Sequence, residues 1–177
     1  MSKLIIVCGL AGSGKTTLAN ELSKELKLVC LNKDYLKELI FENLGFSTAE
    51  ESSRVGKATM SIFLNLAEQQ IARGLDLIME SLFNFSADYK ILKEWENKYN
   101  LEIFSVVCFI DKTEREKRYH NRPRHQAHFD KDVKAHHFSD DPEYDYAQIP
   151  GKQIRITTNK SVAELVRDVC IATQNKD

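Results

Sequence analysis

Residues 9–16 read GLAGSGKT and constrain this chain more than any other segment, because they fit the pattern G-x-x-x-x-G-K-[ST]. The apolar run Leu4–Cys8 precedes them, and a helical pattern follows from Thr17. A strand, a glycine-rich loop and a helix in this order form a phosphate-binding loop, or P-loop. The glycines let backbone N–H groups turn towards phosphate oxygens, and the helix N-terminus adds its positive dipole end. The alternative is a glycine-rich β–α turn that binds no ligand.

The pattern also gives roles to its last residues. Lys15 is expected to reach the β- and γ-phosphates of ATP, and the Thr16 hydroxyl is expected to ligate Mg²⁺. The predicted nucleotide-binding residues are Gly9, Leu10, Ala11, Gly12, Ser13, Gly14, Lys15, Thr16 and Thr17.

Apolar, β-branched runs alternate with longer helical patterns along the rest of the chain. This alternation predicts an α/β fold, with a parallel sheet covered by helices on both faces. The length of 177 residues favours a single domain, 1–177. The predicted strands are 3–8, 28–32, 75–79, 103–110 and 153–157. The predicted helices are 15–26, 34–44, 53–73, 87–99, 112–121 and 161–173.

Two carboxylates follow predicted strands. Asp34 comes after strand 28–32 and has two interpretations: an N-cap for a helix beginning at Tyr35, or a group that accepts a proton from a substrate hydroxyl or positions Mg²⁺. Glu80 follows strand 75–79, as the acid of a Walker B segment does. It either holds Mg²⁺ through water or the acceptor, or is a strand-end carboxylate bound by backbone N–H groups.

An arginine-rich helix is predicted to begin a lid over about 112–150. Arg115, Arg118 and Arg122 recur at helical spacing, and Pro123 ends the pattern. Arginines that close over a transferring phosphoryl group neutralise its charge and help to exclude water. We expect Arg118 and Arg122 to act in this way, with Arg115 and Arg124 as weaker candidates. The alternative is a solvated basic helix face.

Five histidines lie in or beside the same segment: His120, His125, His128, His136 and His137. The pair His125 and His128 has a spacing that allows metal binding, but no clear third ligand accompanies it. They are therefore interpreted as lid residues, some of which titrate near neutral pH.

The loop 157–160 after the last strand is placed to touch a purine base. Neither 159–162 nor 32–35 completes the guanine-specifying pattern N-K-x-D, which favours ATP over GTP.

Charge and apolar content exclude some classes of function. The net charge of −1 argues against a general attraction to nucleic acid or to an anionic membrane. No run of about 18 apolar residues is present, so no membrane span is expected. The chain enters a strand at its start, and its cysteines form no C-x-x-C pair. We therefore expect a cytoplasmic protein with reduced cysteines at Cys8, Cys30, Cys108 and Cys170.

The GKT loop, Asp34, Glu80 and the arginines, taken in order, resemble the small P-loop kinases that include chloramphenicol phosphotransferase, the zeta-toxin kinases and the kinase domain of bacteriophage polynucleotide kinase. The resemblance covers nearly the whole chain. It implies the sheet order 2-3-1-4-5, an acceptor-hydroxyl base at Asp34, and lid arginines at Arg118 and Arg122. The polynucleotide kinase has an arginine where this chain has Lys37, and the change loses bidentate phosphate recognition.

The sequence therefore predicts an ATP- and Mg²⁺-dependent kinase that phosphorylates a hydroxyl of a small molecule, with Lys15, Asp34, Arg118 and Arg122 as catalytic residues. Arg54, Lys57 and Lys37 are candidates for contact with an anionic acceptor. Two alternatives remain open. One is a polynucleotide 5′-hydroxyl kinase, which needs a basic channel leading to Asp34. The other is a nucleotide-dependent switch or partner-binding ATPase without phosphotransfer. Neither the acceptor nor the oligomeric state can be read from the sequence.

Overall fold

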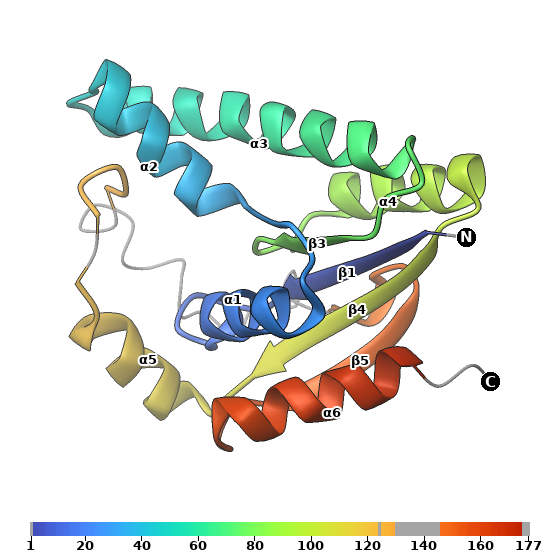
Figure 1. The fold of residues 1–177 in the computed structure, drawn as a ribbon. Helices are drawn as coiled ribbons and strands as arrows, with labels where there is room; N and C mark the ends of the chain where they lie inside the picture. Colours follow the sequence, from blue (N-terminus) through green and yellow to red (C-terminus); the bar gives the residue numbers. More distant parts are fainter. Residues whose placement is uncertain (1, 124, 130–145, 175–177) are drawn as a thin grey trace.

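A computed structural model describes residues 2–123, 125–129 and 146–174 (Figure 1). These residues form five strands and six α-helices, which alternate except that α2 and α3 are consecutive. The strands are β1 (Lys3–Cys8), β2 (Cys30–Asn32), β3 (Leu77–Glu80), β4 (Glu102–Phe109) and β5 (Lys152–Thr157). The helices are α1 (Lys15–Leu26), α2 (Lys33–Leu44), α3 (Ala49–Ile71), α4 (Ser86–Tyr99), α5 (Lys112–Asn121) and α6 (Val162–Gln174), with a 3₁₀ turn η3 at Tyr146–Gln148.

The strands form one parallel sheet in the order β2-β3-β1-β4-β5. The predicted α/β fold and the order implied by the resemblance are therefore confirmed. Parallel strands are joined by crossover helices, so all their carboxyl ends lie at one edge. Figure 1 shows α2 and α5 beyond that edge, where the loops that follow β1, β3 and β4 also lie.

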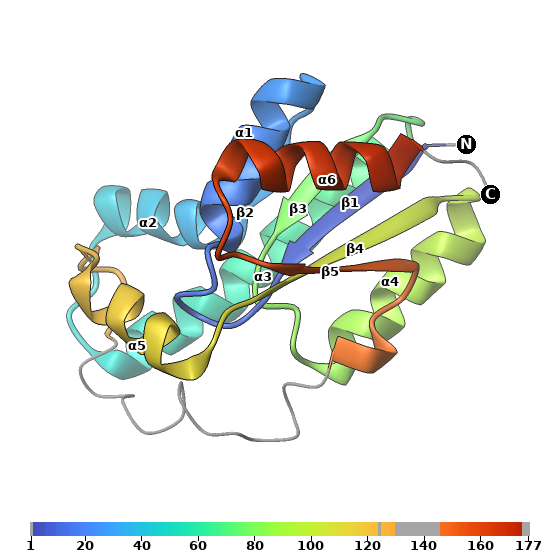
Figure 2. The ribbon, with the colours of Figure 1, turned by 90° about the horizontal axis from the view of Figure 1, so that it is seen from below.

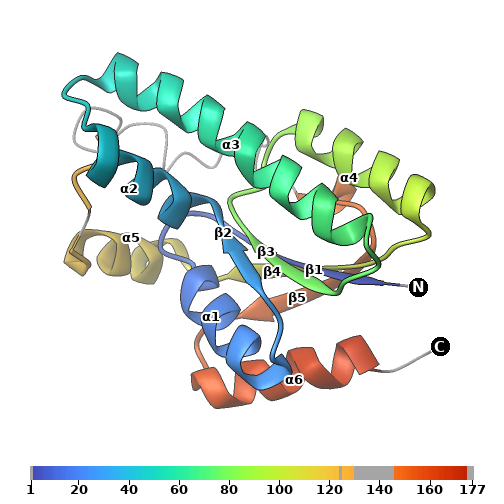
Figure 3. The same ribbon diagram turned by 45° about the horizontal axis from the view of Figure 1, so that its top comes forward.

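Alternate residues of the central strands enter two apolar layers. Leu4 and Ile6 of β1 face Phe63 of α3 and Trp95 of α4. Ile5 and Val7 face α1 and α6 on the opposite side. The helices cover both faces in Figures 2 and 3. A strand buried on both faces needs apolar residues at every position, which accounts for the continuous apolar run in β1.

The second and third strands are shorter at their start than predicted. β3 begins at Leu77, which pairs with Leu4. Just before it, the side chain of Asp76 rather than its backbone accepts the Lys3 N–H, at 2.7 Å. The apolar residues Val29 and Leu75 lie outside the strands and are exposed. Because the prediction relied on apolar character alone, both predicted strands began too early.

Helix α3 begins earlier than the predicted residue 53. Thr48 accepts the Glu51 N–H at 3.1 Å, and Glu51 accepts the Thr48 N–H at 3.2 Å. This capping box fixes the start of the helix at Ala49. Figure 3 shows α3 crossing the β3 side of the sheet with α4 beside it. Of the predicted lid 112–150, α5, 125–129 and η3 lie among the described residues; Arg124 and 130–145 do not.

Candidate active site

The P-loop connects β1 to α1 in a conformation that side chains would obstruct. Gly9 has φ of 140° and Gly12 has φ of 85°, where glycine is favoured. A Cβ atom at Gly9 would lie 2.5 Å from the Cys108 carbonyl oxygen. At Gly12 it would lie 2.5 Å from that of Arg115. The loop is thus seated closely against β4 and α5.

Glu80 is the central carboxylate of the site and is buried at the end of β3. The Thr16 hydroxyl donates to its Oε2 at 3.2 Å, and the amide of Asn32 donates to the same oxygen. Lys15 Nζ lies 3.9 Å from its Oε1. Burial raises the pKa of Glu80, while Lys15 opposes that rise and Asp34 adds to it. The end of β3, the P-loop and the end of β2 therefore meet at one carboxylate.

Asp34 lies in the first turn of α2 and does not cap it. The cap is Asn32, whose Oδ1 accepts the Tyr35 N–H at 2.9 Å, and the helix begins at Lys33. Asp34 Oδ1 lies 3.4 Å from Lys33 Nζ, and the side chain is 39% exposed. The capping interpretation of Asp34 is therefore wrong. Asn32 takes that task, and Asp34 lines the space beside the P-loop.

Two adjoining cavities share Lys15, Asp34 and Arg122. The first has a volume of about 420 Å³ and extends from Ala11 and Glu80 along the loop after β3 to the start of α4. The second, of about 550 Å³, lies between α1 and α2 and is also lined by Thr16 and Asn32. Volumes in this range suit small ligands. We call the first the acceptor cavity, because the acceptor of the predicted kinase is expected beside Asp34 and Glu80, which both line it.

The predicted lid arginines lie in different places. Arg122 lines both cavities. Arg118 instead donates to Thr158, to Oγ1 at 3.2 Å and to the carbonyl oxygen at 3.1 Å. Thr158 Oγ1 in turn donates to the Ser13 carbonyl oxygen of the P-loop at 2.8 Å. Arg115 is buried against Gly12. Arg118 therefore borders the loop after β5, on the side predicted to face a purine.

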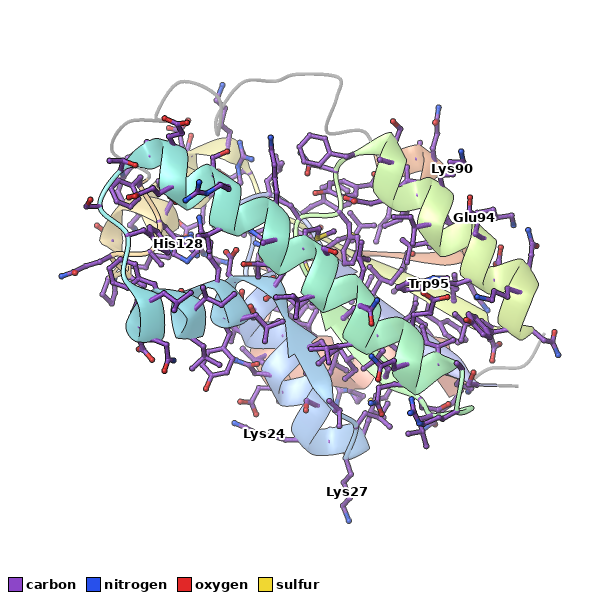
Figure 4. The ribbon with its side chains drawn as sticks, turned by 90° about the horizontal axis from the view of Figure 1, so that it is seen from above. Lys24, Lys27, Lys90, Glu94, Trp95 and His128 are labelled. Carbon is purple, nitrogen blue, oxygen red and sulfur yellow. The ribbon has the colours of Figure 1, made fainter. Side chains whose placement is uncertain are left out.

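Residues 125–129 fold back onto α2 and α3. His128 Nε2 lies 2.9 Å from Glu38 Oε1, and its side chain is 5% exposed. Ser52 donates to the Ala127 carbonyl oxygen at 3.1 Å. Figure 4 shows His128 between α2 and α3, and it lines the acceptor cavity. Sequence reasoning did not assign these contacts, although the histidine cluster marked the segment.

The three basic residues predicted to contact an anionic acceptor lie in different places. Lys57 lines the acceptor cavity. Lys37 is buried and donates to Ser52 Oγ at 2.8 Å. Arg54 is exposed and lines neither cavity. The lysine that stands where a polynucleotide kinase has its arginine is therefore built into the α2–α3 contact.

Oxygen donors suited to Mg²⁺ gather beside the P-loop. Thr16 contacts Glu80, and Asp34 is close enough to affect its pKa. Hydroxyl and carboxylate oxygens are the ligands that Mg²⁺ prefers, directly or through water. Among the described residues, no group of three His, Cys, Asp or Glu side chains could hold a metal by itself. A site built from protein, water and nucleotide oxygens fits this arrangement.

The four cysteines are free thiols. Cys8 and Cys108 are buried, whereas Cys30 and Cys170 are only partly covered. Burial raises the pKa of Cys108 and of Cys30 to about 12, so both remain protonated. Within the described part of the chain, no helix is long and apolar enough to span a membrane.

Comparison with known proteins places these features in context. A family model described as an AAA domain matches residues 4–140. A candidate kinase of Chloroflexus aurantiacus superposes with a TM-score of 0.79 at 26% identity, covering 98% of this chain and 96% of that one. The APS kinase of Mycobacterium tuberculosis, in complex with AMPPNP and APS, gives 0.67 at 18% identity, with 98% of both chains covered. A gluconokinase of Sinorhizobium meliloti gives 0.54 at 14% identity, with 94% and 88% covered. The search of curated proteins found no match.

Proposed function

The chain belongs to the family of AAA domains, and we propose that it is an ATP-dependent kinase that transfers the γ-phosphate to a hydroxyl group of a small molecule. One observation carries the proposal. Lys15, Asp34 and Glu80 line one cavity at the carboxyl edge of the sheet, immediately beside the P-loop. Ligands of open parallel sheets bind at this edge. The fold shared with a candidate kinase, an APS kinase and a gluconokinase supports the same conclusion.

The donor side of the reaction rests on the P-loop. Backbone N–H groups of 9–17 would surround the phosphates, and Lys15 would neutralise charge between the β- and γ-phosphates. Thr16 would ligate Mg²⁺, with Glu80 and Asp34 as partners through water. When bound, Mg²⁺ supplies charge neutralisation on the phosphate oxygens. In the structure, the Thr16 hydroxyl donates to Glu80.

The acceptor side rests on Asp34. Its carboxylate is held at the start of α2 and lines the acceptor cavity. It would accept the proton of the attacking hydroxyl, or hold that hydroxyl in line with the γ-phosphorus. Arg122 lines the same cavity and would stabilise the transferring phosphoryl group. Arg118 would complete the nucleotide site from the Thr158 side.

The acceptor cavity favours a small molecule over a nucleic acid. Its volume of about 420 Å³ corresponds to a small organic ligand. Lys37 contacts Ser52 and does not line this cavity. The lysine at the position of the polynucleotide kinase's arginine is therefore not placed to contact a phosphate bound in this cavity.

A transfer assay tests the proposal. Wild-type protein is incubated with Mg²⁺ and γ-labelled ATP, together with alcohols, polyols, amino alcohols or a 5′-hydroxyl oligonucleotide, and labelled products are separated from free phosphate. We expect label on a small-molecule hydroxyl, and no transfer by Lys15→Ala. Label on the oligonucleotide alone would identify a polynucleotide kinase. ATP hydrolysis that labels no acceptor and survives Asp34→Ala would identify a switch and contradict the proposal.

A further inference from the structure

The wall of the acceptor cavity formed by the loop after β3 and by α4 carries two polar groups that the transfer step does not use. Asn84 and Asp88 both line the cavity. Asn84 Oδ1 is buried and has no hydrogen-bond partner among the described residues. Asp88 is 8% exposed. Burying such an oxygen without a hydrogen-bond donor lowers the stability of the folded protein, so each of the two groups needs an explanation.

The surroundings of Asp88 stabilise its buried carboxylate only in part. The residue lies in the first turn of α4, where the helix dipole favours a carboxylate. Burial raises the pKa of Asp88, and a hydrogen bond with the Phe85 backbone offsets part of the rise. No side chain in the described part of the chain pairs with this carboxylate. A carboxylate accepts up to about four hydrogen bonds, so it retains capacity for a ligand.

The loop that carries Asn84 is held in an unusual conformation. Phe83 has φ of 47°, in the left-handed region, and is buried against Phe63 at a ring distance of 6.0 Å. Tyr146 donates to the Leu82 carbonyl oxygen at 2.8 Å. These contacts fix the loop from both sides. Asn84 and the exposed ring of Phe85 are thereby placed on the cavity wall.

The charges around the cavity restrict what can donate to these oxygens. An ammonium group and a set of hydroxyl groups are the two donors to consider. The other charged residues lining the cavity are the carboxylates Asp34 and Glu80 and four cations, Lys15, Lys33, Lys57 and Arg122. The cations outnumber the carboxylates even when Asp88 is counted, so the cavity favours neutral hydroxyl groups over an ammonium group.

We propose that Asn84 and Asp88 recognise a polyhydroxylated acceptor, accepting hydrogen bonds from neighbouring hydroxyl groups while another hydroxyl of the same molecule faces Asp34. Phe85 provides an apolar surface beside them. The inference rests on the proposed kinase function and adds the substrate class. Asn84 and Asp88 are specificity-determining residues in it, and Asp34 remains the group at the reacting hydroxyl.

The test combines protein variants with altered acceptors. Phosphorylation of glycerol, ribose, glucose and sorbitol is compared with that of propan-1-ol, ethanolamine and a 5′-hydroxyl oligonucleotide. For the best polyol, deoxy analogues lacking one hydroxyl at a time are then assayed with wild type, Asp88→Asn and Asn84→Ala. Glu94→Gln is the matched control, because Glu94 is exposed on the same helix and points away from α3 in Figure 4.

We expect a polyol to be the preferred acceptor and Asp88→Asn to lower its kcat/KM by about 100-fold, because the site loses a buried acceptor. For one deoxy analogue, Asp88→Asn should lower kcat/KM by less than about 3-fold, because the hydroxyl group that Asp88 binds is already absent. Glu94→Gln should behave as wild type. Thermal unfolding of each variant checks its fold, and Asn84→Ala carries the test if Asp88→Asn does not fold.

Three results overturn the inference. In the first, only ethanolamine, propan-1-ol or the oligonucleotide accepts phosphate, and in the second the variants affect the polyol and all its deoxy analogues equally. The first leaves a kinase with a different acceptor, and the second leaves a polyol kinase in which Asn84 and Asp88 do not contact the acceptor's hydroxyl groups. In the third, nothing is phosphorylated; if ATP hydrolysis then also survives Asp34→Ala, the proposed function fails with it.

Discussion

At Glu80, burial and electrostatic pairing oppose each other. The carboxylate has lost most of its water, yet Thr16, Asn32 and Lys15 surround it. Its place at the end of a buried strand was predictable from the apolar run before it. Its contact with Asn32 was not, because Asn32 lies 48 residues earlier and on another strand. A pattern along the chain does not specify which side chains two neighbouring strands bring together.

The raised pKa of Glu80 predicts how stability depends on pH. The folded protein binds this proton more tightly than the unfolded chain does. The stability contributed by Glu80 is therefore present below its ordinary pKa of 4.5 and is lost as the pH rises through the higher folded value. In nucleotide-free protein, Glu80→Gln should lose less stability than wild type on going from pH 4.5 upwards. Urea unfolding at several pH values measures this; a difference between the two proteins that stays constant with pH would contradict it.

The positions of Arg118 and Arg122 predict different kinetic effects. Arg118 contacts Thr158 beside the P-loop, so Arg118→Ala should raise the KM for ATP about 10-fold with little change in kcat. Arg122 lines the acceptor cavity, so Arg122→Ala should lower kcat by about 100-fold. Steady-state assays with saturating acceptor separate the two. Equal effects of both variants on both constants would assign them one shared role.

Helix α2 illustrates how an element carries a functional side chain. Asp34 had two interpretations in the sequence because aspartate both caps helices and acts in catalysis. The structure gives capping to Asn32, whose side chain also donates to Glu80. The helix begins at Lys33. One side chain thus fixes both the helix start and the buried carboxylate.

Replacing Asn32 should therefore affect stability and activity together. Asn32→Ala should destabilise the protein by about 1 kcal/mol through the lost cap, and lower transfer because Glu80 loses a donor. Thr48→Ala is the control: it removes the cap of α3 at a comparable cost, and Thr48 lines neither cavity. Urea unfolding and the transfer assay measure both effects. Loss of transfer in Thr48→Ala, or its retention in Asn32→Ala, would argue against this double role.

The contacts of segment 125–129 with α2 and α3 could not be predicted from the sequence. Its contacts join His128 to Glu38 and Ala127 to Ser52, across 90 and 75 residues. No periodic pattern marks such contacts, because they depend on how α2 and α3 cross. The helical spacing of the arginines in α5, by contrast, is a local property and was predicted over the observed residues 112–121.

At the scale of the whole molecule, the alternation of apolar strands with helices was sufficient to predict the fold class. The strand order came from the resemblance and is confirmed. The same order places the ends of β1, β2 and β3 side by side, which brings Lys15, Asp34 and Glu80 to one cavity. The shape of the acceptor cavity, in contrast, depends on a left-handed residue at Phe83 that no local pattern indicates.

The central claim is that this edge binds ATP and presents a hydroxyl to it through Asp34. The most direct test measures two properties of Asp34→Asn: thermal stabilisation by Mg²⁺ with ATP, and transfer of labelled phosphate to the best acceptor. We predict near-normal stabilisation with transfer reduced by about 100-fold or more, whereas Lys15→Ala should lose both. Transfer that persists in Asp34→Asn, or stabilisation that disappears together with transfer, would contradict the account.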